Sequence, residues 1–140
     1  MLDNVRTCCT KINETKTTIP RILFSLPKPR YNLNIGSMTH GAQTGRMIES
    51  IEKVLEKNYF DNVIIYGDTN STLAGGLAAI KLDLPIAHIE AGVRTGNLES
   101  PEEINRKLCD HIATINFSAT KISYQNLKNE GISDVRNYFS

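Results

Sequence analysis

Two apolar segments that each end in a carboxylate constrain the fold of this chain more than any other feature. The first is Val63–Tyr66, followed after a glycine by Asp68, and the second is Pro85–Ile89, followed directly by Glu90. In an open parallel α/β sheet, ligands bind in the crevice outside the carboxyl ends of the strands. We therefore expect Asp68 and Glu90 to face one shared crevice, where paired carboxylates favour acid/base chemistry over packing.

Strand-like and helix-like segments alternate from Tyr31 onward. The expected elements are a strand at 31–35, a helix at 40–57, a strand at 63–66, a helix at 71–82, a strand at 85–89, a helix at 101–111, a strand at 113–117, a helix at 119–130 and the start of a strand at 135–138. This alternation predicts an α/β fold with a Rossmann-like parallel sheet. Residues 1–26 show no sustained period and are interpreted as a leader of unclear structure. Residues 27–140 are interpreted as one partial domain, because both ends of the chain look cut.

Composition narrows the function classes. The chain has 140 residues, of which 40% are hydrophobic and 22% charged, as in an ordinary globular domain. A formal net charge of +1 favours neither nucleic acid nor a membrane surface as a partner. No apolar stretch approaches the roughly 20 residues of a membrane span, and the N-terminus lacks a signal-peptide core. Three cysteines without C-x-x-C spacing predict no disulfide framework, so we expect a cytoplasmic protein.

Cofactor and metal motifs are absent from the sequence. It contains no G-x-x-x-x-G-K-[ST], no G-x-G-x-x-G and no G-x-S-x-G, which counts against a P-loop, a dinucleotide site and a hydrolase elbow. His40, His88 and His111 lack metal-ligand spacing, and His88 and His111 are interpreted as core or surface histidines. We expect neither a cofactor nor a metal, and we interpret Cys109 as a buried small residue.

The turn after the first segment has two possible roles. Asp68–Thr72 can expose backbone N–H groups that bind phosphate or sugar oxygens, or Asp68 or Ser71 can simply cap the following helix. Glu90 raises a similar choice between a functional acid and a structural ion pair, for which Arg94 is the natural partner.

Two adjacent acids begin the helix predicted at 101–111. Glu102 and Glu103 lie four and three residues before Arg106, so one acid can pair with the arginine while the other faces the cleft. The alternative is that both acids only compensate the helix dipole.

Four linked motifs together resemble one family. They are G-S-x-T-H-G-x-Q-T-G at 36–45, Y-G-D-T-N-S-T-L-A-G at 66–75, H-I-E-A-G-V-R at 88–94 and P-E-E-I-N-R at 101–106. In order and spacing they resemble the non-hydrolysing UDP-N-acetylglucosamine 2-epimerases, over about Pro27 to Ile132.

The resemblance implies a fold and a reaction. It implies the incomplete N-terminal half of a glycosyltransferase-B-like, two-domain enzyme that holds the sugar nucleotide between Rossmann-like halves. Such enzymes convert UDP-GlcNAc to UDP-ManNAc by eliminating UDP and adding it back on the other face of a 2-acetamidoglucal. The resemblance assigns essential catalytic roles to Asp68, Glu90 and Glu102, without deciding which is the base.

Further residues and partners are also implied only by the resemblance. Five residues are expected to contact the substrate or hold the loops: His40, Gln43, Thr69, Arg94 and Arg106. A homodimer is expected, or a partner chain that supplies the missing C-terminal half. Which UDP-sugar is used stays open, because relatives act on UDP-GlcNAc or on diacetamido uronic acids.

Departures from the family bear on activity. Family members are much longer, and the C-terminal residues that hold UDP are missing, so we expect a truncated form with impaired turnover. One alternative is a non-catalytic relic that serves as a sugar-nucleotide-binding or interaction module. A poorer one is a flavodoxin-like receiver domain, which needs an acidic cluster where the first predicted strand, at 31–35, is followed by Gly-Ser.

Overall fold

The computed structural model describes residues 30–36 and 38–139, so the leader predicted over residues 1–26 lies outside the described part. The strands are β1 Val63–Tyr66, β2 Ile86–Ile89, β3 Ile115–Ser118 and β4 Asn137–Phe139. The helices are α2 His40–Glu56, α3 Asn70–Lys81, α4 Pro101–Ile112, α5 Lys121–Asn129 and the 3-10 turn η1 Asp134–Arg136.

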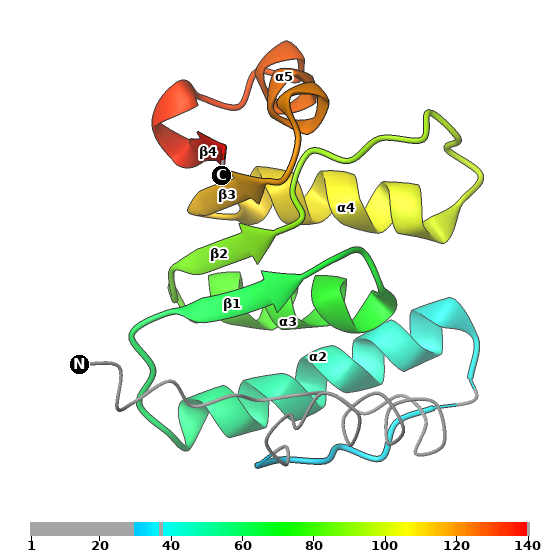
Figure 1. The fold of residues 1–140 in the computed structure, drawn as a ribbon. Helices are drawn as coiled ribbons and strands as arrows, with labels where there is room; N and C mark the ends of the chain where they lie inside the picture. Colours follow the sequence, from blue (N-terminus) through cyan, green and yellow to red (C-terminus); the bar gives the residue numbers. More distant parts are fainter. Residues whose placement is uncertain (1–29, 37, 140) are drawn as a thin grey trace, which may run out of the picture.

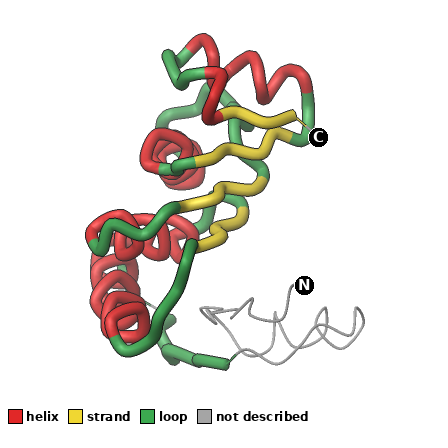
Figure 2. The backbone as a smooth tube through the Cα atoms, turned by 90° about the vertical axis from the view of Figure 1, so that its left-hand side faces the viewer, coloured by secondary structure: helices red, strands yellow, loops and turns green. Residues whose placement is uncertain are grey.

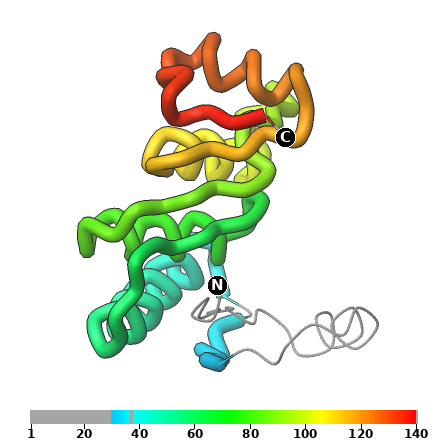
Figure 3. Tube along the Cα trace, turned by 60° about the vertical axis from the view of Figure 1, so that its left-hand side comes forward, coloured from blue at the N-terminus to red at the C-terminus, as the bar shows by residue number. Residues whose placement is uncertain are grey.

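The four strands form one parallel sheet in the order β1-β2-β3-β4, as Figure 3 shows from green to red. Helices α3 and α4 lie on one side of it, with α2 packed beside α3 (Figures 1 and 2). Because each strand is followed by a helix before its parallel neighbour, the predicted α/β class with a Rossmann-like sheet is confirmed.

Apolar spacing explains how the helices pack. Met47, Ile51 and Leu55 recur every four residues of α2 and are buried, so they form one stripe toward the core. Helix α3 is rich in alanine and glycine, which allows close packing. A Cβ on Gly76 would lie only 3.0 Å from the side chain of Ile112 on α4. Small residues therefore let α3 sit between the sheet, α2 and α4.

The strand predicted at 31–35 is wrong. Residues 31–35 form no strand, although Leu33 and Ile35 pack against the core as the alternation suggested. Asn34 has a φ of 51°, in the left-handed region, which interrupts an extended conformation. The strand predicted to begin at Val135 begins at Asn137 instead, because the 3-10 turn η1 occupies the preceding residues.

The sheet face opposite α3 and α4 is apolar and largely uncovered by the described residues. Strand pairing aligns two rows across this face: Ile64, Ala87 and Ile115 in one, and Tyr66, Ile89, Phe117 and Tyr138 in the other. Ile64 is 55% exposed and Tyr66 is 67% exposed. Such side chains normally face a second layer.

Candidate functional site

Three helices begin at the edge of the sheet where the strands end. Helices α2, α3 and α4 all have their N-termini on the right of Figure 1, at the carboxyl ends of β1 and β2. Each helix N-terminus carries unpaired backbone N–H groups and a partial positive charge. Asp68 and Glu90, which follow β1 and β2, therefore lie at an edge of the sheet where anionic or hydroxyl-rich ligands are favoured.

Asp68 lies in the turn from β1 to α3. Gly67 makes this turn with a φ of 71°, and Thr69 is the N-cap, its hydroxyl accepting a hydrogen bond from the backbone N–H of Thr72. The cap is therefore Thr69, rather than Asp68 or Ser71. The Asp68 carboxylate is free of capping and forms an ion pair with Arg106 of α4.

An asparagine joins all three helices near this turn. The Asn70 side-chain amide donates to His40 Nδ1 over 2.9 Å and to Gln43 Oε1 over 3.0 Å. Asn70 Oδ1 accepts from Asn105 of α4 over 3.1 Å, and the same Asn105 amide also donates to the backbone carbonyl of Asp68 over 2.9 Å. The predicted substrate residues His40 and Gln43 are thus brought beside Asp68, through an asparagine that the sequence interpretation did not single out.

Glu90 occupies a strained position at the end of β2. Its φ of 75° is in the left-handed region, which costs a non-glycine residue on the order of 1–2 kcal/mol. One carboxylate oxygen lies 3.6 Å from the point where a Cβ on Gly67 would be, so Glu90 sits against the turn that carries Asp68. The carboxylate has no hydrogen-bond or ion-pair partner among the described residues. Because Glu90 is exposed, water can solvate the carboxylate, and it is the strained backbone that favours function over structure.

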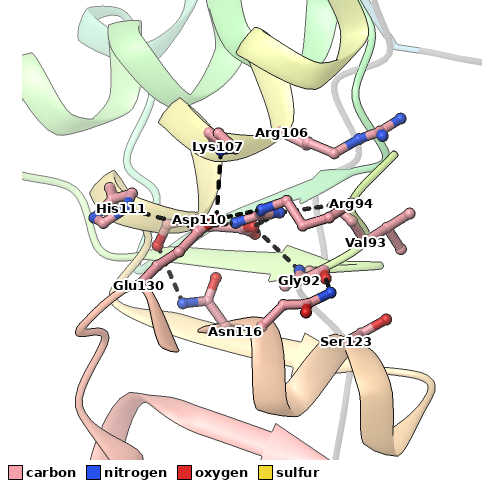
Figure 4. A network of polar contacts seen from close by, with 12 residues as sticks. Gly92, Val93, Arg94, Arg106, Lys107, Asp110, His111, Asn116, Ser123 and Glu130 are labelled. Atoms are coloured by element: carbon pink, nitrogen blue, oxygen red, sulfur yellow. Dashed lines mark hydrogen bonds and ion pairs between the residues drawn. The ribbon is translucent and has the colours of Figure 1, made fainter. Parts of the chain in front are cut away.

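Of the two alternatives for Glu90, the structural ion pair with Arg94 is not formed. Arg94 instead donates to Asp110 over 2.7 Å and to both carboxylate oxygens of Glu130, over 2.8 and 2.5 Å (Figure 4). Burial opposes the charge on Arg94, but these two carboxylates outweigh it and raise the pKa of the guanidinium. Arg94 therefore holds the loop after Glu90 against α4 and α5.

One of the two acids at the start of α4 pairs with Arg106, as one interpretation proposed. Glu103 is fully buried and pairs with Arg106 over 2.7 Å, while it accepts hydrogen bonds from the backbone of Thr95 and Gly96. Burial opposes ionisation, yet these bonds lower the pKa of Glu103 to about 2. Glu102 is exposed at the same edge, and a hydrogen bond from Ser100 lowers its pKa.

Helix α4 buries its charged face, which the sequence interpretation missed. Glu103, Arg106 and Asp110 are buried, whereas the apolar Ile104 and Leu108 are 41% and 45% exposed. Charged residues at helical spacing ordinarily mark the solvent face. The apolar pair Ile104 and Leu108, at i,i+4 spacing on the opposite face, would by the same rule predict that their own face is buried, so this pattern could not have identified the buried face.

Other features of the described part of the chain bear less on the site. His88 and Cys109 are fully buried, as expected, and burial raises the pKa of the Cys109 thiol to about 12. An open hollow beside Ile35 and Glu49 contains none of the predicted site residues. Within residues 30–36 and 38–139, no three His, Cys, Asp or Glu side chains are placed to hold a metal ion, and no helix is long and apolar enough to cross a membrane.

Comparison with curated proteins finds enzymes of one kind. The chain is 54% identical over 111 residues to the UDP-N-acetylglucosamine 2-epimerase of Methanocaldococcus jannaschii. It is 57% identical over 108 residues to the UDP-2,3-diacetamido-2,3-dideoxy-D-glucuronate 2-epimerase of Pseudomonas aeruginosa. These alignments cover 79% and 77% of this chain but only 30% of either relative, so the chain spans about a third of their length.

Solved structures agree with the fold described above. The crystal structure of the M. jannaschii UDP-GlcNAc 2-epimerase with UDP-GlcNAc and UDP matches with a TM-score of 0.86 and 50% identity, over 88% of this chain and 34% of that one. The Neisseria meningitidis UDP-GlcNAc 2-epimerase bound to UDP-GlcNAc matches with a TM-score of 0.88 and 36% identity, over 94% of this chain and 36% of that one. The predicted fold class, part of a glycosyltransferase-B-like enzyme, is therefore confirmed.

A family model supplies the last comparison. The model described as UDP-N-acetylglucosamine 2-epimerase matches residues 4–137, nearly the whole chain. The match begins before Pro27, where the motif resemblance began, and so includes most of the predicted leader. The four motifs, the fold and the family model agree, and the chain belongs to the UDP-N-acetylglucosamine 2-epimerase family.

Proposed function

We propose that this chain provides the sugar-binding and acid/base part of a UDP-GlcNAc 2-epimerase site. One observation carries the proposal: three carboxylates that match the family motifs, Asp68, Glu90 and Glu102, come from three different elements and lie around the same edge of the sheet. Asp68 is tied to α4 through Arg106, and Glu90 lies against Gly67.

Three acids suit this reaction. Removal of the C2 proton by a carboxylate and loss of UDP from C1 create a C1=C2 double bond. The return of a proton to the opposite face, with addition of UDP, then gives the 2-epimer. Each proton transfer needs a group within hydrogen-bond reach. Asp68, Glu90 and Glu102 are the proposed catalytic residues, while Arg106 sets the orientation of Asp68.

The remaining predicted site residues have mixed roles in this proposal. His40 and Gln43 contact the sugar from α2, where the amide of Asn70 orients both. The hydroxyl of Thr69 caps α3 and is therefore not available to the ligand. The proposed contribution of Thr69 is instead through the backbone N–H groups at the start of α3 that remain free. Arg94 holds the loop that carries Glu90 rather than the ligand.

The substrate class is a UDP-2-acetamido sugar, and UDP-GlcNAc is the proposed member. The relatives named for UDP-GlcNAc and for UDP-diacetamido-glucuronate are almost equally similar to this chain, at 54% and 57% identity. Overall identity therefore does not distinguish between these two sugars.

Turnover is proposed to require more polypeptide than this chain. Preorganised groups that stabilise a leaving group are usually the largest contribution to such a reaction. The resemblance places the UDP-binding groups in the C-terminal half of family members, so they are proposed to come from polypeptide outside these 140 residues, in the same or in a partner chain. A cytoplasmic location is part of the same proposal.

An NMR titration tests the sugar-binding part. The isotope-labelled chain is titrated with UDP-GlcNAc and, separately, with UDP, and the backbone amide signals are followed. We expect UDP-GlcNAc to shift the signals of Asp68, Glu90 and Glu102, and UDP alone to leave them in place. Equal shifts with UDP, or no shifts at these residues with either ligand, would contradict the proposal.

A further inference from the structure

We propose that the buried pair His88 and Asp110 positions the two loops that carry Asp68 and Glu90, and that His88 does so as a doubly protonated imidazolium. His88 lies on β2 and Asp110 on α4, and both side chains are fully buried. The inference rests on the proposed function for its catalytic meaning, but its structural content is independent of any substrate.

Both ring nitrogens of His88 face hydrogen-bond acceptors. Nδ1 lies 2.7 Å from Asp110 Oδ1, and Nε2 lies 2.9 Å from the backbone carbonyl oxygen of Gly67. A neutral imidazole has only one N–H group, so it can donate to only one of these oxygens. With Asp110 as a carboxylate, which can only accept, the ring makes both hydrogen bonds only when both nitrogens carry a hydrogen.

Asp110 is also paired with an arginine. It accepts from Arg94 over 2.7 Å, and Arg94 pairs with Glu130. Glu130 is partly exposed, and Lys107 and His111 of α4 approach it at 3.6 and 3.8 Å (Figure 4). Because Arg94 and Lys107 already oppose Asp110 and Glu130, the imidazolium is inferred from the two acceptors that face the ring and not from a charge count.

The pair connects two loops to a single carboxylate. Gly67 immediately precedes Asp68, so the bond from His88 fixes the carbonyl that begins the Asp68 turn. The other oxygen of Asp110 accepts the backbone N–H of Gly92 over 3.1 Å, two residues after Glu90. Because α4 also carries Glu102, Asp110 connects the helix that carries Glu102 with the loops that carry Asp68 and Glu90.

Ring NMR on the unmodified chain tests the protonation state. We expect the His88 ring to show two protonated nitrogens at neutral pH, with one-bond N–H couplings at both. A ring with one protonated and one bare nitrogen would overturn the proposal. This measurement needs no variant, so it remains decisive if the variants below fail to fold.

Hydrogen exchange on variants tests the positioning role. Asp110→Asn removes the charge that faces His88 and Arg94, and we expect amide exchange to become at least 10-fold faster at Gly67 and Gly92, whose N–H groups donate to Ile89 and Asp110, but not in the middle of β1. The matched control is Thr114→Val, which removes a hydrogen bond to the backbone of Ile86 at the opposite end of β2. We expect this control to leave exchange at Gly67 and Gly92 unchanged.

The outcomes separate this inference from the proposed function. Equal acceleration throughout the chain in Asp110→Asn, or none at the two loops, would show that the pair does not position them specifically. Failure of UDP-GlcNAc to bind would overturn the proposed function while leaving the ring and exchange results unaffected.

Discussion

At the scale of single residues, Glu102 and Glu103 are adjacent in sequence and opposite in environment. Glu103 is fully buried and bonded to Arg106, Thr95 and Gly96, whereas Glu102 is exposed and accepts from Ser100. Glu103 therefore stabilises the fold, whereas the carboxylate of Glu102 is accessible to a ligand.

Paired substitutions separate these roles. Glu103→Gln removes the charge of one of the two carboxylates that pair with the buried Arg106, and it is expected to lower the free energy of unfolding by about 2–4 kcal/mol. Glu102→Gln, its matched control on the exposed side, should change it by less than about 0.5 kcal/mol. Denaturant unfolding curves provide the measurement, and similar losses in both variants would contradict the assignment.

Glu103 also predicts how stability depends on pH. Its pKa is lowered from the ordinary value of 4.5 to about 2, so in that window the unfolded chain binds a proton that the folded chain does not. Stability from this carboxylate is therefore fully present above about pH 4.5 and is lost as the pH falls toward 2. Between pH 4.5 and pH 2, the free energy of unfolding should fall more steeply for the unmodified chain than for Glu103→Gln. Parallel pH profiles of the two proteins would argue against the lowered pKa of Glu103.

At the scale of elements, the loop after β2 packs against α5 through one glycine. Gly92 has a φ of 80°, and a Cβ there would lie 2.1 Å from the backbone oxygen of Ser123. Gly96 has a similar φ of 75° with nothing within 4 Å of the same point. Both glycines have a left-handed backbone, but only at position 92 would a Cβ clash with another residue.

Alanine substitutions measure that close approach. Gly96→Ala should cost about 1–2 kcal/mol from the left-handed backbone alone. Gly92→Ala should cost more than about 3 kcal/mol, because Ser123 backbone must move as well. The melting temperatures of the two variants are compared. Equal values would show that α5 moves away from residue 92 at no cost in stability.

Sequence patterns predicted elements better than the contacts between them. The helix at His40–Glu56 and the strand at Val63–Tyr66 follow from spacing alone, because local periodicity reflects burial on one face. The segment 31–35 alternates in the same way yet forms no strand, because strand formation also needs a pairing partner.

For the candidate site as well, the sequence predicts individual residues better than the contacts between them. The motifs predict Asp68, Glu90 and Glu102 as catalytic residues, but they do not predict that Arg94 pairs with Asp110, which lies sixteen residues away on a helix whose charged face turns inward. Long-range ion pairs of this kind depend on how elements pack, and one sequence contains no direct signal for them.

At the scale of the whole molecule, the sheet presents an apolar face opposite α3 and α4. The two rows across β1 to β4 contain exposed isoleucine, phenylalanine and tyrosine side chains. Contiguous apolar area of this kind promotes association and binds apolar dyes.

Dye binding tests this description. The chain is expected to enhance ANS fluorescence in its folded state, and Tyr66→Ser should reduce the enhancement at least twofold because it interrupts one row. Tyr59→Ser is the matched control, since Tyr59 is 82% exposed but lies outside the sheet. An equal effect of both variants, or no enhancement by the folded chain, would contradict an exposed apolar sheet face.

The measurement that tests the central claim most directly is proton NMR of UDP-GlcNAc in deuterated water, following the C2–H signal. The chain is supplied with the remaining two-thirds of the M. jannaschii relative as a separate polypeptide, and the same mixture is prepared with Glu102→Gln. We predict loss of the C2–H signal and appearance of the manno epimer with the unmodified chain, and at least 100-fold slower exchange with Glu102→Gln. No exchange in the first mixture, or equal exchange in both, would contradict the claim that these carboxylates form the acid/base part of a 2-epimerase site.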